Sequence, residues 1–433
     1  MHAGDTRPTA APRFGLTVES SMTAIFPDNF GLIFDADNHY WESSDAFTRY
    51  RDPKFNDRGL RVVQINGKLC YFIGNKPHPI LPGPGDAHGR PVPGSLLDYF
   101  AGKASSDPHN ANLWSEIPAE HPEWFNRDAR LKTMDAQGIA ACWMFPSHGV
   151  CIEGPMQPDI EASLHIISAF NRWLHDDWGF AYQDRIFAAP LLSLSDLDHA
   201  LCELEWVLAR GTRIIAIRNG PAFTREGMRS PADPMFDPFW ARVEEAGITV
   251  TAHIGFEDGY EDVDAAIGRV WGLDLKGKTK TISVGHAASF GFDAQLIHMM
   301  QKHRLIRDFA TMLIAHGLFT RFPRLRLAYI ENGGTWVGSL LHDLQVSHVQ
   351  NPGMYAQNPV DQFHRNCWVA PFVEDEVPEL AKHLPVERIL FGSDWPHAEG
   401  IGQPRDFLRN LSGFSHRDQQ RIMMDNAREL TFA

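Results

Sequence analysis

Four side chains of the kinds that bind divalent metal ions stand at the ends of short apolar runs: Asp37, His39, His253 and Asp394. Asp37 and His39 are two residues apart, so in an extended strand both side chains point to one side. His253 ends the run ITVTAH and Asp394 ends RILFGSD. Mixed imidazole and carboxylate ligation at a mononuclear site suits Zn, Mn or Fe(II) rather than a metal that prefers thiolate. Such an ion would bring a bound water to a pKa of about 7, or polarise a substrate carbonyl.

The elements that would bring these side chains together follow from the apolar runs themselves. Continuous apolar runs, rather than alternation, are typical of strands buried on both faces of a parallel sheet, and segments of helical periodicity lie between them. Eight strands that alternate with helices predict a (β/α)8 TIM barrel, whose strand ends converge on one axis. A doubly wound open sheet is the alternative, but no GxGxxG follows the first run. The predicted strands are 31–37, 139–146, 186–192, 212–218, 248–253, 325–331, 366–371 and 388–394.

The chain is longer than a minimal barrel, and the surplus falls in three places. Residues 1–30 start with a Pro/Ala/Thr-rich stretch and are predicted to form an N-terminal arm, while 31–433 form a single barrel domain. Two insertions, 51–121 and 255–290, interrupt the barrel, the first with a predicted β-hairpin around Asn66-Gly67. Both follow strands, so we expect them over the C-terminal face, where active sites of this fold lie.

Three further side chains near the strand ends are candidates for roles around the metal. Arg218 ends the fourth strand and is a candidate for binding a carboxylate, with an ion pair to a neighbouring strand as the alternative. His397 could hydrogen-bond a metal ligand or the substrate, or pack on Trp395 as a loop residue. Asp35 could orient His39, or form a buried salt bridge.

The composition favours a small-molecule substrate over a macromolecular partner. The formal net charge is −14 and the sequence pI about 5.8, which argues against nucleic acid or an anionic membrane surface as the main partner. The first residues contain no apolar run of signal-peptide length, and no run reaches the roughly 18 residues of a membrane span. The five cysteines are scattered without a CxxC pair, which fits a reducing cytoplasm.

The chain is also rich in histidine and tryptophan, with 21 and 12 residues. These residue types line sites as often as they fill cores, so position must decide. His286, in the second insertion, is a candidate for reaching the substrate pocket. Trp41, just after the first strand, is a candidate for an aromatic pocket wall, with packing inside the barrel as the alternative.

Several longer stretches resemble one known family. They are FDADNHYWES at 34–43, TAHIG at 251–255, FTRFPRLRLAYIENGGTWV at 319–337 and ILFGSDWPH at 389–397. They are similar to the amidohydrolase-related (amidohydrolase 2) family of the amidohydrolase superfamily, which includes aminocarboxymuconate-semialdehyde decarboxylase. The resemblance implies a distorted (β/α)8 barrel, one catalytic divalent metal and a homodimer. It also implies an enzyme that either releases carbon dioxide or attacks a carbonyl with water.

Two positions depart from the pattern of that family. Its first-strand His-x-His falls on Asp37 and His39, and the strand-six histidine of its HGG motif falls on Glu331. The resemblance assigns metal binding to His253 and Asp394 as well, with proton transfer at Asp394. Glu331 can take a proton from water, and Asp37 adds a negative charge that weakens the Lewis acidity of the metal.

The function expected first is a metal-dependent hydrolase in the cytoplasm. Metal-bound water would attack the carbonyl of a C–C, ester or thioester-type bond in a small organic acid or acyl substrate, with Asp394 or Glu331 taking the proton. Zinc is the metal expected first, and manganese or iron are the alternatives. The second hypothesis is a non-oxidative decarboxylase of an aromatic or unsaturated carboxylic acid, and a remote third is a catalytically silent barrel that binds a ligand.

Overall fold

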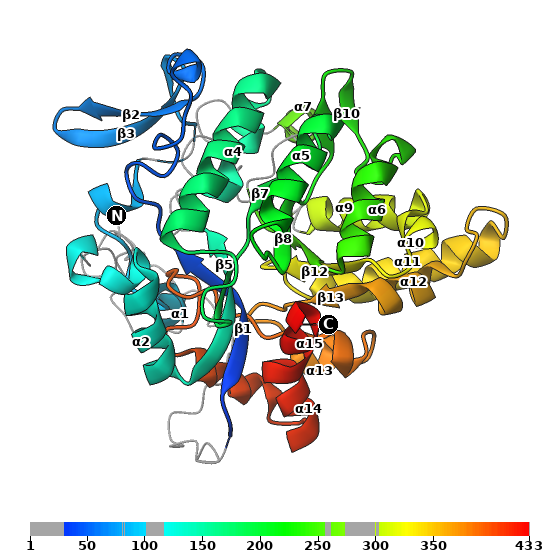
Figure 1. Cartoon of the computed structure of the whole chain (residues 1–433). Helices are drawn as coiled ribbons and strands as arrows, with labels where there is room; N and C mark the ends of the chain where they lie inside the picture. Colours follow the sequence, from blue (N-terminus) through cyan, green and yellow to red (C-terminus); the bar gives the residue numbers. More distant parts are fainter. Residues whose placement is uncertain are drawn as a thin grey trace, which may run out of the picture.

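A ring of parallel strands with helices outside it forms the centre of the computed structural model (Figure 1). The strands pair in the orders β1-β5-β6 and β13-β12-β11-β8-β7, which matches the predicted (β/α)8 barrel. The structure describes residues 30–79, 81, 83–100, 117–255, 261–272, 299 and 303–432. The strands are β1 (Ile33–Tyr40), β5 (Ile139–Pro146), β6 (Ile186–Ala188), β7 (Leu191–Leu192), β8 (Ile214–Arg218), β11 (Thr249–His253), β12 (Arg326–Ile330) and β13 (Cys367–Val369).

The eighth predicted strand closes the ring through single hydrogen bonds rather than a continuous ladder. On one side the Leu390 amide donates to the carbonyl of Val369 at 2.9 Å, and on the other the Ala36 amide donates to the carbonyl of Phe391 at 2.9 Å. Pairing with β13 and β1 is limited to isolated bridges. The prediction of a regular strand over 388–394 is therefore wrong in its regularity, although the segment takes the predicted place between its neighbours.

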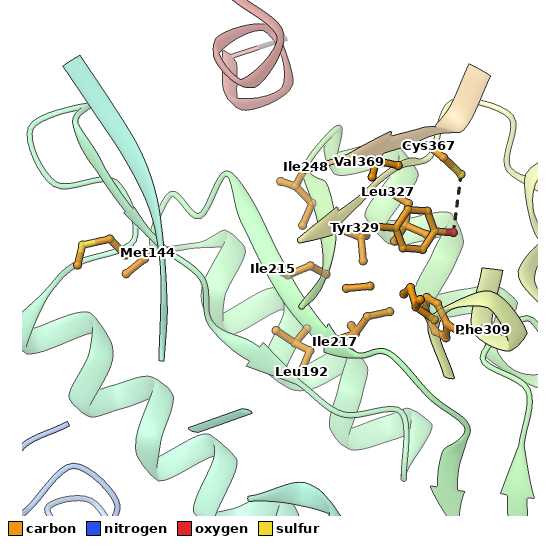
Figure 2. Packing of buried hydrophobic residues seen from close by; sticks show 14 of the residues in the cluster. Met144, Leu192, Ile215, Ile217, Ile248, Phe309, Leu327, Tyr329, Cys367 and Val369 are labelled. Carbon is orange, nitrogen blue, oxygen red and sulfur yellow. Dashed lines mark hydrogen bonds between the residues drawn. The ribbon is translucent and has the colours of Figure 1, made fainter. Parts of the chain in front are cut away.

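Side chains of each strand alternate between the inside of the ring and the layer beneath the helices. The outward side chains of β8 and β12 pack with Phe309 of helix α9 (Arg304–Ala315), as Figure 2 shows. These side chains are Ile215, Ile217, Leu327 and Tyr329. Because both faces of the strands are buried, their sequences read as continuous apolar runs.

The inside of the ring is filled by a second apolar cluster, which contains several aromatic side chains. Phe34 stacks on Phe187 with ring centroids 6.2 Å apart, and Trp143 meets Phe34 edge-on at the same separation. Side chains fill a barrel of this size completely, so the ring is a packed core rather than a channel.

Helices cover the outside of the ring, between the strands in sequence. Helix α6 (Asp237–Ala246) is capped by Gly247, whose φ of 65° lies in the left-handed region that glycine adopts without strain. No helix in the described ranges is long and apolar enough to cross a membrane. The main helices are α2 (Arg127–Gln137), α4 (Ile160–Asp177), α5 (Leu197–Leu208), α6 (Asp237–Ala246), α9, α11 (Thr335–Gln350), α12 (Pro359–Asn366) and α15 (Asn426–Phe432).

The first insertion contains the predicted hairpin. Strands β2 (Leu60–Ile65) and β3 (Lys68–Ile73) pair antiparallel and turn at Asn66 and Gly67, whose φ angles of 50° and 80° fit a type I′ turn. In Figure 1 the hairpin extends from one side of the barrel. Of the second insertion the structure describes residue 255 and helix α7 (Glu261–Trp271) with the residue after it. His286 and most of the predicted N-terminal arm lie outside the described residues.

Candidate metal centre

Two imidazoles and two carboxylates meet at the C-terminal end of the ring. Nε2 of His39 lies 3.2 Å from Oδ1 of Asp37 and 3.3 Å from Nε2 of His253. Nε2 of His253 lies 3.4 Å from the same Asp37 oxygen and 3.3 Å from Oε2 of Glu331. Asp394 adjoins the group, with its Oδ1 3.3 Å from Nε2 of His39. Predicted site residues from β1, from β11, from the end of β12 and from segment 388–394 are thus brought together.

These separations fit a divalent metal ion. With metal–ligand bonds of about 2.0–2.1 Å in tetrahedral geometry, neighbouring ligand atoms lie about 3.3–3.4 Å apart. Nδ1 of His253 lies 2.6 Å from the carbonyl oxygen of Ile254, so it donates there and Nε2 keeps a lone pair toward Asp37. Burial lowers the pKa of His39 to about 3, which keeps that ring neutral. Oδ1 of Asp37 is buried with no hydrogen-bond partner among the described residues, and a cation would satisfy it.

An irregularity in β1 turns Asp37 and His39 into the ring. Ala36 belongs to the cluster inside the ring, so regular alternation would direct its odd-numbered neighbours outward. The register of β1 against β5 shifts between Asp35 and Asn38. A shift of this kind re-aims the side chains that follow it, which is why such irregularities recur beside active sites.

Left-handed backbone turns the other two carboxylates toward the histidines. Glu331 has a φ of 54° and Asp394 a φ of 55°, a region that non-glycine residues adopt at a cost. Ile330 already faces the inside of the ring, so the positive φ is what brings Glu331 back to the same side. Near Asp394, Gly392 permits close approach to β1, since a Cβ there would lie 2.5 Å from the Cβ of Asp37.

The carboxylates repel one another in a buried setting. Burial raises the pKa of Glu331 well above its usual range, and the charges of Asp394 and Asp37 raise it further. Burial also raises the pKa of Asp394, with a contribution from Glu399. Burial opposes ionisation of Asp37 too, but the imidazoles of His253 and His39 beside its Oδ1 outweigh burial and hold its pKa well below the usual range. A divalent cation would offset this concentration of negative charge.

A chain of hydrogen bonds leads away from Asp394. Its Oδ1 lies 2.6 Å from Nδ1 of His397, whose Nε2 lies 2.8 Å from the Ser147 hydroxyl. That hydroxyl donates to the carbonyl of Tyr40 at 2.7 Å, so it accepts from Nε2–H of His397. Burial lowers the pKa of His397, so the ring is neutral and Nδ1 accepts. Together with the raised pKa of Asp394, this favours a proton on the carboxyl group of the pair.

Aromatic rings hold the imidazoles in place. Phe145 lies beneath the site, 4.6 Å from the ring centroid of His253 and 6.2 Å from that of His39. Trp41 packs edge-on against His397 at 5.2 Å and is only 3% exposed. The structure therefore places Trp41 behind His397, as a support for the ring.

Asp35 was a candidate for orienting His39, but its hydrogen bonds go to other residues. It accepts hydrogen bonds from the Ser393 amide at 2.9 Å, the Ser393 hydroxyl at 2.5 Å and the Asn38 side chain at 2.9 Å. These bonds tie β1 to the residue before Asp394, so Asp35 fixes the backbone that presents the carboxyl groups.

A pocket lies beside the metal donors. Strands β8 and β11 pair so that Arg218 stands next to His253, and both line the pocket. The Arg218 guanidinium packs on the ring of Phe223 at 4.2 Å and donates to the carbonyl of Pro221 at 2.6 Å. The other lining residues are Gly149, Val150, Glu153, Gly154, Ile167, Leu191, Leu192, Ala216, Ile217, Asn219 and Gly255.

Two residues of the site escape prediction from the sequence. Ser147 follows the end of β5 and carries no motif beyond its place after a strand. Glu399 groups with Glu331, Asp394 and His397 as a possible metal ligand set, and its spacing from Asp394 signals nothing by itself. The one signal for Ser147 is its place directly after β5, whose end lies on the same face as the other strand ends.

Comparison with known proteins decides the family. Residues 159–431 match the model of a family described as amidohydrolase. The chain belongs to the amidohydrolase family. A solved amidohydrolase of Mycobacterium avium subsp. paratuberculosis K-10 is 39% identical to it with a TM-score of 0.83, over 93% of this chain and 99% of that one. The expected family is confirmed, and the protein is an enzyme of the amidohydrolase superfamily.

More distant solved structures share the fold of this amidohydrolase. One is 2,6-dihydroxybenzoate decarboxylase from Rhizobium, 21% identical with a TM-score of 0.53 over 79% of this chain and 96% of that one. Another is 5-carboxyvanillate decarboxylase from Novosphingobium aromaticivorans, complexed with manganese, 15% identical with a TM-score of 0.55 over 93% of this chain and 96% of that one. No curated protein matches the chain.

Proposed function

We propose that this amidohydrolase is a divalent-metal-dependent, non-oxidative decarboxylase of an aromatic or unsaturated carboxylic acid. The observation that carries the proposal is the buried Asp394 carboxyl group beside the metal donors, with its Oδ1 2.6 Å from Nδ1 of His397 and 3.3 Å from Nε2 of His39. A decarboxylase needs an acid at the carbon that loses carbon dioxide. The decarboxylases among the structures of similar fold support the same reaction class.

The residues divide the reaction between them. Asp37, His39, His253 and Glu331 would hold the metal, with Asp394 as a further ligand candidate; the ion supplies positive charge that binds the carboxylate and stabilises negative charge. Manganese has support from the solved decarboxylase that contains it, while zinc stays the prediction from ligand type. Arg218 would orient the substrate carboxylate.

The proposed step needs no reactant other than the substrate and the proton of Asp394. The bond between the ring carbon and the carboxylate breaks, its electron pair stays on the carbon, and that carbon takes the proton of Asp394. Carbon dioxide leaves, and Asp394 regains a proton from solvent. The homodimer and the cytoplasmic location stay predictions from the resemblance and the composition.

Hydrolysis is the second candidate, and one contact favours it. Oε2 of Glu331 lies 3.3 Å from Nε2 of His253, a position from which it can accept the proton of a water that attacks a carbonyl. The substrate would then contain a C–C, ester or thioester-type bond. The solved relative at 39% identity carries the name amidohydrolase, which suits either reaction.

One assay separates the candidates. Carbon dioxide release is measured on the manganese-loaded enzyme with a panel of hydroxybenzoates, beside cleavage of aryl esters and acyl thioesters. Release of carbon dioxide without ester or thioester cleavage supports the decarboxylase. Cleavage without carbon dioxide overturns it in favour of the hydrolase. Binding of less than about a tenth of an equivalent of added manganese or zinc would support the third hypothesis, a catalytically silent barrel that binds a ligand.

A further inference from the structure

The pocket beside His253 has a second polar wall that the proposed reaction does not use. Glu153 is the first residue of the short helix α3 (Glu153–Met156) and lines the pocket. Its Oε1 accepts from the hydroxyl of Ser193 at 2.5 Å and from that of Ser195 at 3.2 Å. Both serines are buried, so the carboxylate is fixed in place by its inner oxygen. Oε2 is left as an acceptor for a ligand.

Asn219 offers a second acceptor in the same pocket. Its Nδ2 donates to Oδ1 of Asn332 at 3.1 Å, and Nδ2 of Asn332 donates to the carbonyls of Ala252 and Ile330 at 2.9 and 2.7 Å. The amino group of Asn332 donates to two carbonyls, so its oxygen must face Asn219. These bonds set the orientation of both side-chain amides. Oδ1 of Asn219 therefore remains to accept.

The charges in the pocket orient whatever binds there. Arg218, Asn219 and His253 lie on the side of β8 and β11, whereas Glu153 comes from the segment after β5. A substrate carboxylate is attracted to the first side and repelled by Glu153. Apolar side chains such as Ile167, Leu192 and Ile217 make up much of the remaining wall, which suits a flat hydrocarbon body.

We infer that Glu153 is a specificity residue: it selects substrates that carry a hydroxyl or amino group away from the reacting carboxylate. This inference rests on the proposed function for the identity of the reacting end. A site built to accept a hydrogen bond rejects a substrate that lacks the donor, because the buried acceptor is then left unpaired. The substrate class is therefore a hydroxylated or amino-substituted aromatic or unsaturated acid.

The test compares a hydroxyl group with a methoxy group at one position. Binding of 2-nitrophenols is measured by calorimetry on manganese-loaded enzyme, with a second hydroxyl or a matched methoxy group on the ring. The nitro group replaces the carboxylate, so no chemistry is needed. The hydroxyl compound should bind about tenfold to a hundredfold more tightly. In Glu153→Gln an amide N–H₂ replaces Oε2, so the preference should disappear or favour methoxy. Glu226→Gln, at an exposed turn, is the matched control.

The outcomes separate this inference from the proposed reaction. The same preference should appear in kcat/KM for carbon dioxide release from the matching benzoates. Loss of the binding preference in Glu153→Gln, with no carbon dioxide from any benzoate, supports the role of Glu153 while overturning the decarboxylase. Release of carbon dioxide with an unchanged hydroxyl preference in Glu153→Gln overturns the role of Glu153, as does a wild type that binds both compounds equally.

Discussion

Strand β11 reaches the metal centre as a regular strand, whereas β1 and segment 389–395 reach it through irregular backbone. From Thr249 to His253, β11 pairs in unbroken register with β8 on one side and β12 on the other. By contrast, β1 shifts register before Asp37, and Asp394 has a left-handed backbone. The regular strand places the imidazole of His253. The irregular segments place the carboxylates, which repel one another when buried, and β1 also places the second imidazole, that of His39.

The difference shows where the site stores strain. A non-glycine residue in the left-handed region costs about 1–3 kcal/mol, and both Glu331 and Asp394 adopt it. Hydrogen bonds from neighbouring residues hold this backbone in place, among them the two from Ser393 to Asp35. The strained residues are the ones that a divalent ion would stabilise, so binding of the metal and retention of the strained backbone support each other.

The largest effect should follow from loss of the donor on the regular strand. His253→Ala removes a nitrogen that no neighbouring side chain replaces, so we expect less than a tenth of an equivalent of metal and at least about a thousandfold loss of kcat/KM. Metal content is measured by mass spectrometry after gentle purification. His316→Ala, at an exposed position, should keep both metal and activity. Stoichiometric metal in the His253 variant would refute its place in the donor set.

Asp394→Asn tests the irregular side, where we expect chemistry to fail while the metal stays. Asp37, His39, His253 and Glu331 remain as donors, so metal content should be unchanged. The kcat for carbon dioxide release should fall about 10²- to 10⁴-fold because the acid is gone. If metal and activity disappear together, Asp394 acts as a ligand rather than as the proton donor.

Gly392→Ala tests how tightly the irregular segment must approach β1. The added methyl group would stand 2.5 Å from Cβ of Asp37, so one of the two segments must move. We expect metal affinity to fall about tenfold to a hundredfold, as for other changes that disturb ligand positions, measured by titration against a competing chelator. Gly413→Ala has open space around its Cβ and should bind metal as the wild type does.

A fourth prediction concerns the end of β1 and affects stability rather than catalysis. Burial raises the pKa of Glu42 from its usual 4.5 to about 7, despite hydrogen bonds from the amides of His148 and Gly149. Between those two pH values the folded state binds more protons than the unfolded state, so this group lowers stability as pH rises. Glu42→Gln keeps the acceptor for both amides, which are bonded to Oε1, and removes the charge.

The gain from Glu42→Gln should be about 3 kcal/mol above pH 7 and should vanish below pH 4.5. Urea unfolding of the variant and the wild type across this range measures it. Glu226→Gln, at an exposed position, should show no such trend. A gain that does not change with pH would show that packing, and not the buried charge, is responsible.

The part of the site on the regular strand could be predicted from the sequence better than the part on irregular backbone. His253 could be predicted because a buried apolar run ends in a histidine and parallel strand ends converge. The same reasoning brought Asp37, His39 and Asp394 to the right face, but it assumed straight strands. The register shift in β1 and the left-handed φ of Glu331 depend on contacts with residues far away in the sequence, which local patterns do not contain.

The aromatic packing inside the ring also determines from which side substrate and solvent can reach the site. Phe34, Trp143, Phe145 and Phe187 fill the space below the donors, so the centre resembles a well with a closed floor. In the proposed decarboxylation, substrate, carbon dioxide and exchanging solvent would then share the opening at the C-terminal face. An occupied pocket shields the reacting carbon from water, and each turnover ends only when the mouth clears.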